Sequence, residues 1–535
     1  MSLLTIALRL NRSHSKFVHP LLHSTVSFFS AAFHRTVSVP TRNPFHFSTS
    51  QSFSNQSNIY PFNLIQHRIR SHDFLNQGIL ETLKRAASFP SEAEAMACID
   101  ESGVKADENL VYAVIWELRH EWTLAFLGFK WGEKSRCIDE KACELMVWIL
   151  GNHEKFNISW TVIRDMHQSC LNIRQAMLIM IDRYAAANKP GKAIQAFNFM
   201  EKFKLAPDEE AFYSLLNTLC SHGYIEEAEE FMVVSKKLFP LEIEGFNIIL
   251  HGWCNICVDL LEAKRIWREM SRSCITPNAT SYTCMISCFS KAGNLFDSLR
   301  LYDEMKKRGL VPGVEICNSL IYVLTRENCL EEALKFLDKM KEVGLQPDST
   351  TFNSMIKPLC EKKKLVEARN VLAAMIEENI SPTMETYHAF LEVEGTGFEA
   401  TLEILNQMQI AGVAPKEDTF LLIINKFFKL EQADNALKNL LEMKHYEVQP
   451  DMTHYTVTVE GLVRCGLLTK ARECYADMRS DGFSDDPKLQ RILQEPIQDR
   501  NSKEKDRGGE VWRDRRVNYK KGRIVQGKSR KTTST

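Results

Sequence analysis

Apolar residues in the middle of the chain recur with the spacing of one face of an α-helix. The segment 314–348 shows this pattern twice. Its first half places four apolar residues at i, i+3, i+4 and i+7, namely Cys317, Leu320, Ile321 and Leu324. Its second half repeats a helical spacing with Ala333, Leu334, Leu337 and Met340. Gly344 can then supply a positive φ and Pro347 prevents the helix from continuing, so the pattern predicts two helices followed by a turn.

Three columns of residues repeat at a period of 35 residues across this part of the chain. A small-residue column, with one spacing of 33, comprises Ala193, Ala228, Ala263, Ser298, Ala333, Ala368, Thr401, Ala436 and Ala471. A methionine column seven residues later comprises Met200, Met270, Met305, Met340, Met375, Met408, Met443 and Met478, with Ser235 as the exception. A proline column seven residues further on comprises Pro207, Pro277, Pro312, Pro347, Pro382, Pro415 and Pro450. Columns that keep this register indicate a repeat array.

A two-helix unit of this length cannot bury both of its apolar faces alone, so neighbouring units must stack. The small residue lets two helices approach closely, and methionine fills the irregular gap at the next interface. We therefore expect an all-α fold, a right-handed α-solenoid of stacked two-helix 35-residue repeats. Its curved inner surface would be built mainly from the first helix of each unit.

Two segments carry a family resemblance, residues 246–254 (FNIILHGWC) and residues 352–360 (FNSMIKPLC). Together with unit endings of the form Glu-Ala…Met…Gly…Pro-Asp, they resemble the pentatricopeptide repeat (PPR). The related tetratricopeptide repeat has a 34-residue period and a Trp…Leu-Gly…Tyr signature, and neither is present. Uniform units near 35 residues resemble those of the P-type branch of the family. The resemblance is to PPR proteins of plant organelles.

The resemblance divides the chain into segments. The nine repeats are 174–208, 209–242, 243–278, 279–313, 314–348, 349–383, 384–416, 417–451 and 452–486. Their lengths of 34, 36 and 33 residues are attributed to residues lost or gained in connecting turns. Residues 139–173 are expected to form a degenerate repeat and residues 73–138 an N-terminal helical cap. The remaining segments are a leader, 1–72, and a basic tail, 487–535.

Charge is segregated along the chain, so the net charge of −1 is misleading. Residues 1–72 contain seven Lys or Arg and no Asp or Glu, residues 501–535 carry a charge of +8, and residues 73–500 carry −16. An acid-free, Arg- and Ser-rich leader is typical of an organelle transit peptide, and we predict import into the mitochondrial matrix with cleavage near Phe47. A chloroplast location and a merely disordered leader are the alternatives. The tail interleaves Trp512 and Tyr519 with cations, which suits single-strand binding or a disordered basic tail.

The resemblance implies binding of single-stranded RNA, one base per repeat, by two or three side chains. In the family the readers are the fifth residue of the first helix and the last residue of the unit. The pairs in this chain are Asn247/Asn278, Thr283/Gly313, Asn318/Asp348, Asn353/Thr383 and Thr456/Asp486. By resemblance, Asn318/Asp348 implies uracil, Thr456/Asp486 implies guanine and Asn247/Asn278 implies a pyrimidine. The alternative is that these residues only cap helices.

Several positions depart from the family's pattern. Four pairs have no assigned base: Leu178/Asp208, Tyr213/Glu242, His388/Lys416 and Leu421/Asp451. The family's apolar wedge at the second position is replaced by Glu244, Thr280, Glu315, Thr350 and Thr453. Base packing should therefore be weaker in these units.

Cations near position 13 of the repeat would contact phosphates, as they do in the family. The matching residues are Lys291, Arg326, Lys429 and Arg464, with Asn255 and Glu361 breaking the row. A cation at this place can also pair with its own helix dipole. Acidic pairs such as Glu226-Glu227 and Glu331-Glu332 fall on second helices, where we expect a solvated outer face.

Other chemistry is not expected from the sequence. A zinc deaminase needs His-x-Glu followed by Cys-x-x-Cys, and residues 487–535 contain neither His nor Cys. The single Cys-x-x-Cys, Cys254 to Cys257, begins at a core position, and we expect the cysteines to be reduced thiols. The sequence contains no apolar run of 18 residues, so no membrane-spanning helix is predicted. We therefore predict a non-enzymatic binder of organelle RNA, without metal or cofactor and with possible protein partners in RNA processing. The alternative is a solenoid scaffold for proteins in the mitochondrion.

Overall fold

The computed structural model describes residues 73–89, 91–393, 397–483 and 485–494. All regular secondary structure in these residues is helical, which confirms the all-α prediction for this part of the chain. The predicted transit peptide, its predicted cleavage near Phe47 and the residues of the predicted tail beyond 494 lie outside the described residues. The chain divides into two compact units, the first up to Leu320 and the second from Ile321, and the division falls within α16 (Val314–Arg326).

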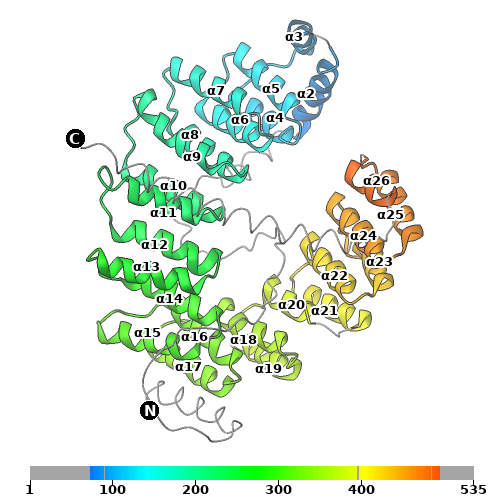
Figure 1. Cartoon of the computed structure of the whole chain (residues 1–535). Coiled ribbons are helices and arrows are strands. Elements are labelled where there is room, and N and C mark those ends of the chain that lie inside the picture. The colour runs from blue at the N-terminus through cyan, green and yellow to red at the C-terminus, as the bar shows by residue number, and fades with distance from the viewer. Residues whose placement is uncertain (1–72, 90, 394–396, 484, 495–535) are drawn as a thin grey trace, which may run out of the picture. The chain divides into compact units, whose positions relative to one another are not determined.

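The first unit consists of consecutive helix pairs (Figure 1). Its helices are α2 (Asp73–Ala86), α3 (Glu92–Glu101), α4 (Glu108–Glu117), α5 (Trp122–Lys134), α6 (Glu140–Asn152), α7 (Phe156–Gln168), α8 (Arg174–Ala186), α9 (Pro190–Phe199), η4 (Met200–Phe203), α10 (Glu209–Ser221), α11 (Ile225–Val234), α12 (Ile243–His251), η5 (Gly252–Ile256), α13 (Leu260–Arg272), α14 (Ala279–Lys291) and α15 (Leu295–Lys307). Each even-numbered helix from α2 to α12 packs against the next even-numbered one. The first helices of the pairs therefore form one continuous row.

The second unit has the same organisation. Its helices are α17 (Leu330–Glu342), α18 (Ser349–Glu361), α19 (Leu365–Glu377), α20 (Met384–Leu391), α21 (Phe398–Ile410), α22 (Glu417–Lys429), α23 (Ala433–Glu442), η6 (Met443–Tyr446), α24 (Met452–Arg464), α25 (Leu468–Ser480) and α26 (Pro487–Gln494). The helices α18, α20, α22, α24 and α26 pack on one another in that order. Each unit is thus an α-solenoid of stacked helix pairs.

The small-residue and methionine columns form the interior of this stack. Every member of the small-residue column is 0% exposed, and every methionine of the second column is at most 1% exposed. Where the small residue is not alanine, its hydroxyl bonds to a backbone carbonyl of its own helix. Ser298 Oγ donates to Asn294 O at 2.9 Å and Thr401 Oγ1 donates to Gly397 O at 3.1 Å. These polar side chains are therefore satisfied inside an apolar interface.

One unusual repeat length changes a helix and not a connecting turn, unlike the sequence prediction for that repeat. In residues 243–278, the extra residue is accommodated by the π turn η5 at the end of α12. A π turn holds one more residue than an α turn, so the following helix can keep its place in the stack. In residues 384–416, α20 has 8 residues, whereas α18 and α22 each have 13. In this repeat the first helix is short, and the connection 392–397 that follows it is longer than the three-residue connection after α18.

A buried charged cluster joins three neighbouring helix pairs of the first unit. Asp182 and Arg183, both in α8, are each 9% exposed. Arg183 Nε donates to Asp182 Oδ2 at 2.9 Å, and Arg183 Nη1 donates to Asn152 Oδ1 of α6 at 2.5 Å. His222, which follows α10, places Nε2 3.0 Å from Asp182 Oδ1. Burial alone would raise the Asp182 pKa, but the His222 hydrogen bond and the Arg183 charge outweigh it and lower that pKa.

Candidate nucleic-acid interface

The side chains predicted to read bases occupy two fixed places on the first helices. The fifth residue of a unit lies about one turn inside its first helix, and the last residue stands directly before the next first helix. Asn247 lies in α12, and Asn278 is the N-cap of α14. Because α12 packs against α14, the two side chains meet although 31 residues separate them in the sequence.

The pair Asn247/Asn278 is held in a closed hydrogen-bond network. Asn247 Nδ2 donates to Asn278 Oδ1 at 3.2 Å, and the Ser281 hydroxyl donates to Asn247 Oδ1 at 2.6 Å. Asn278 Oδ1 also accepts the Ser281 backbone N–H at 3.1 Å, which caps α14. The structure therefore brings this predicted pair together and adds a third residue that sequence reasoning did not include.

The pair Asn353/Thr383 has the same arrangement in the second unit. Asn353 Nδ2 donates to Thr383 Oγ1 at 3.2 Å, and Thr386 Oγ1 donates to Asn353 Oδ1 at 2.7 Å. Thr383 is the N-cap of α20, and Thr386 is the third residue of that helix. Asn353 is half-buried, whereas Thr386 is fully buried.

The two threonine pairs are not joined by a side-chain hydrogen bond within the described residues. Thr283 Oγ1 donates to Ala279 O at 2.9 Å, and Gly313 has no side chain to offer. Thr456 Oγ1 donates to Met452 O at 2.8 Å, while Asp486 Oδ1 accepts the Lys488 backbone N–H at 2.7 Å. Each threonine hydroxyl is therefore engaged by its own helix.

Asn318 and Asp348 belong to the same repeat, 314–348, but fall in different compact units of the structure. Each has a distinct environment. Asn318 is 7% exposed, and its Oδ1 has no hydrogen-bond partner among the described residues. Asp348 is exposed and caps α18, because its Oδ1 accepts the Thr351 backbone N–H at 2.8 Å and the Thr351 hydroxyl at 2.9 Å. A buried amide oxygen without a partner is costly, so Asn318 Oδ1 is an acceptor that the other described residues leave unsatisfied.

Several of the last residues cap the helix that follows them. Asn278, Asp348 and Thr383 stand at N-cap positions with capping boxes, and Asp486 bonds to the start of α26. Capping does not remove them from the site, because the same Asn278 oxygen that caps α14 also accepts from Asn247. Cap and contact to the fifth residue coexist in one side chain.

The unassigned pairs show what replaces this arrangement. Leu178 is buried, and Asp208 pairs with Arg174 Nη1 at 2.8 Å. Burial and the negative charge of Glu242 raise the pKa of Tyr213 to about 12. His388 Nε2 lies 3.0 Å from Thr419 Oγ1, and burial lowers the pKa of His388. His388 thus makes the same contact to the next helix as Asn247 and Asn353.

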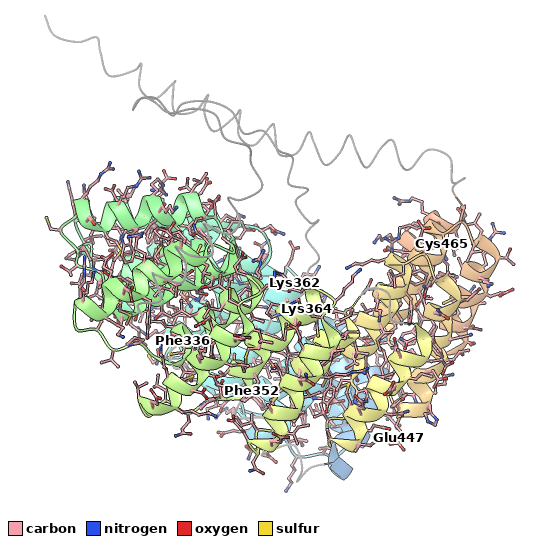
Figure 2. All side chains as sticks on the ribbon, turned by 90° about the horizontal axis from the view of Figure 1, so that it is seen from below. Phe336, Phe352, Lys362, Lys364, Glu447 and Cys465 are labelled. Carbon is pink, nitrogen blue, oxygen red and sulfur yellow. The ribbon has the colours of Figure 1, made fainter. Side chains whose placement is uncertain are left out.

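The predicted phosphate-contacting cations lie at the ends of first helices. Lys429 and Arg464 are exposed, and Lys291 and Arg326 are half-buried. Lys291 Nζ donates to Asn255 Oδ1 at 2.7 Å. Where Glu361 breaks the row, three lysines follow α18, and Lys362 and Lys364 lie at the same end of that helix (Figure 2). Lys362 Nζ donates to Arg326 O, and Lys364 Nζ pairs with Glu367 at 3.1 Å, so these two lysines are engaged by protein groups.

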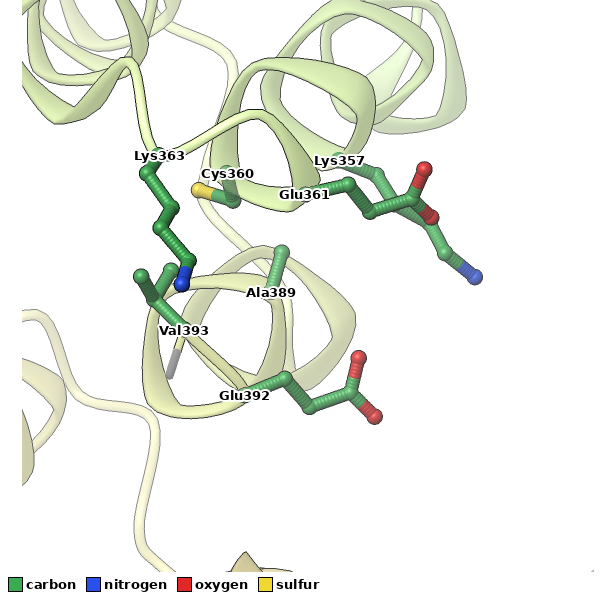
Figure 3. A pocket seen from close by; sticks show the side chains of 7 residues that line it. All are labelled: Lys357, Cys360, Glu361, Lys363, Ala389, Glu392 and Val393. Carbon is green, nitrogen blue, oxygen red and sulfur yellow. The ribbon is translucent and has the colours of Figure 1, made fainter. Parts of the chain in front are cut away.

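A hollow of about 270 Å³ lies beside the ends of α18 and α20. In Figure 3, α18 contributes Lys357, Cys360 and Glu361, and α20 contributes Ala389. Lys363, Glu392 and Val393, which follow the two helices, complete the lining. Both signs of charge face this hollow, so it is not a uniform anion site.

The described residues hold neither a metal-binding cluster nor a membrane-spanning helix. They contain no group of three or more His, Cys, Asp or Glu arranged to hold a metal ion. None of the described helices combines the length and the hydrophobicity needed to span a membrane. Cys254 is buried, Cys257 is exposed, and both are free thiols in the structure.

Comparison with known proteins places this site in a family. The model of the PPR repeat family matches residues 312–361, and the model of the PPR repeat matches residues 176–205, 210–233, 280–310, 350–380 and 453–483. The chain is 60% identical over 471 residues to the Arabidopsis thaliana pentatricopeptide repeat-containing protein At1g80880, mitochondrial, which covers 87% of this chain and 86% of the relative. The chain belongs to the pentatricopeptide repeat family, as its repeat columns predicted.

Two further likenesses were found. The chain is 34% identical over 440 residues to the Arabidopsis thaliana pentatricopeptide repeat-containing protein At5g15010, mitochondrial, covering 80% of this chain and 74% of the relative. Maize PPR10, solved in complex with an 18-nucleotide psaJ RNA element, has 19% identity, a TM-score of 0.30 and coverage of 78% of this chain and 65% of that one. Both Arabidopsis relatives are named as mitochondrial, which supports the predicted mitochondrial location.

Proposed function

We propose that this protein is a P-type PPR protein that binds single-stranded RNA in the mitochondrial matrix and selects it by sequence. It would act on transcripts by occupying them, in stabilisation, processing, splicing or translation, without a catalytic step of its own. The observation that carries the proposal is the repeated contact between a fifth residue and the last residue of its unit. Asn247 with Asn278, and Asn353 with Thr383, present the same paired polar edge on stacked first helices.

The chemistry of the pair suits a base edge. An asparagine amide can donate and accept at once, and single-stranded RNA exposes Watson–Crick edges that need both. One pair per helix pair would give one base per unit. The cations at the ends of the same helices, such as Lys429 and Arg464, would add a sequence-independent attraction to phosphates.

The substitution Asn318→Thr tests the assignment of one base. We expect the preferred nucleotide of that unit to move from uracil towards guanine, because a threonine hydroxyl replaces an amide opposite the base edge. Asn353→Thr is the matched control, and it should change the neighbouring nucleotide and leave the first one as it was. RNA selection by the full-length protein measures both positions, with a shift of at least fivefold expected from a contact that contributes about 1–3 kcal/mol.

The same measurement separates RNA binding from the scaffold alternative. Wild-type protein that selects no sequence and shows no RNA affinity at low salt would favour a protein-binding solenoid. An unchanged preference in Asn318→Thr, with RNA still bound, would contradict only the base assignment.

A further inference from the structure

The third residue of a first helix reaches back to the base-reading residue of the preceding unit. Ser281 Oγ lies 2.6 Å from Asn247 Oδ1, and Thr386 Oγ1 lies 2.7 Å from Asn353 Oδ1. Thr419 Oγ1 lies 3.0 Å from His388 Nε2. All three hydroxyl-bearing residues are 0% exposed, so they cannot contact RNA themselves and can act only through the reader.

The reader is the nearest acceptor for each hydroxyl proton. In each case the hydroxyl oxygen accepts the backbone N–H of the residue that caps its own helix, at 3.2 Å from Asn278 N, 3.0 Å from Thr383 N and 3.2 Å from Lys416 N. The other acceptors within reach of the one hydroxyl proton are farther away than the reader, namely Asn278 Oδ1 at 3.1 Å, Thr383 Oγ1 at 3.3 Å and Met384 Sδ at 3.3 Å. The shortest hydrogen bond of each hydroxyl therefore forms when the reader presents an acceptor to it.

The cap residue determines where the amide nitrogen of the reader must point. Asn278 Oδ1 accepts the Ser281 backbone N–H at 3.1 Å, so the cap turns its oxygen towards Asn247. A flipped Asn247 amide would place its own oxygen against that oxygen and its nitrogen against the Ser281 proton. Only one orientation satisfies both contacts, and it leaves one Nδ2–H of Asn247 to face a base.

A hydroxyl at the third position of a repeat occurs in this chain where the fifth residue of the preceding repeat is Asn or His. The four units whose fifth residue is Asn or His are followed by a Ser or Thr as third residue, in the pairs Asn247/Ser281, Asn318/Thr351, Asn353/Thr386 and His388/Thr419. Three of these hydroxyls contact the reader, whereas the Thr351 hydroxyl donates to Asp348 Oδ1. The five units with another fifth residue are followed by no hydroxyl there, in the pairs Leu178/Ala211, Tyr213/Gly245, Thr283/Ile316, Leu421/His454 and Thr456/Leu489. Capping alone does not explain this correlation, because α10 begins with a capping Asp208 and Ala211 in the third place.

We propose that Ser281 and Thr386 are positioning residues that set the amide orientation of Asn247 and Asn353, and thereby the base that each unit accepts. Thr419 does the same for the imidazole of His388. The proposal rests on the proposed function, since it concerns how the reader meets a base. It assigns specificity to a residue that belongs to the following unit and never touches the RNA.

The test uses full-length protein and RNAs that differ at one nucleotide. Ser281→Ala should reduce the preference at the nucleotide read by Asn247 at least fivefold and leave the preference at the nucleotide read by Asn353 unchanged. Thr386→Val, which keeps the shape and removes the hydroxyl, should do the reverse. Ser281→Thr keeps a hydroxyl at this position and should keep the preference of the wild type. The ratio of affinities for two RNAs is measured, because partial unfolding does not change that ratio.

The outcomes are distinct. Equal losses at both nucleotides in either variant, or unchanged ratios in both, would overturn the positioning role. A preference in Ser281→Thr as low as in Ser281→Ala would also overturn it. If wild-type protein binds none of the RNAs, the proposed function itself fails, and the positioning role fails with it.

Discussion

Raising the salt concentration from 50 to 200 mM is expected to weaken RNA binding by the full-length protein about 50-fold. Four cations are proposed to contact phosphates: Lys291, Arg326, Lys429 and Arg464. Each phosphate contact on a single strand contributes about −0.7 to the slope of log affinity against log salt, which gives a slope of about −2.8 for four contacts. Equilibrium binding across this salt range measures it.

The double substitution of Lys429 and Arg464 to Gln sharpens that prediction. Both residues are exposed at the ends of α22 and α24, so they can be replaced without opening the core. We expect the slope to fall by about half, to about −1.4. Replacement of Lys335 and Lys339 by Gln is the control, since both are exposed on the second helix α17. A double variant with the wild-type slope would refute the phosphate assignment of these two cations.

Asp182→Ala is expected to destabilise the first unit by about 3–5 kcal/mol, the usual cost of removing one partner from a buried ion pair. The substitution leaves the Arg183 guanidinium in the interface between α6 and α8 without its carboxylate. Urea unfolding followed by circular dichroism measures the loss. Glu154→Ala removes an exposed partner of Lys189 in the same unit and should leave the unfolding curve unchanged.

The lowered pKa of Asp182 gives the same cluster a pH dependence. Its contribution to stability is complete above the unfolded-state pKa of about 3.9 and is lost as the pH falls through the folded-state pKa. Asp182→Asn should therefore unfold with a weaker acid dependence than the wild type. An identical acid profile would exclude Asp182 as a source of acid sensitivity.

The interior of the fold was predictable because three columns check one another. Helix packing explains why a small residue and a methionine recur in register, and the members of both columns are buried throughout. The helix irregularities were not predictable. A count of residues cannot show that an insertion forms the π turn η5, or that α20 ends after 8 residues, because turns and helix ends tolerate changes of length.

The candidate site was predictable in its positions and not in its chemistry. The fifth and last residues meet as expected for Asn247 and Asn353, whereas Thr283 and Thr456 turn their hydroxyls to their own helices. The contribution of Ser281 was missed because it lies 34 residues from Asn247 and belongs to the next unit. The buried Asp182 cluster was missed because its members come from three helix pairs with no shared sequence column.

The caps on the first helices have a consequence for building new arrays from this one. Because Asn278 and Ser281 both bond to Asn247, a recombination junction placed at a helix start would separate a reader from its supports. A junction at the fourth residue of each first helix, such as Phe246 and Tyr282, would keep Asn247, Asn278 and Ser281 in one transferred segment. The natural module for exchange therefore begins about one helical turn after the start of the repeat as the sequence displays it.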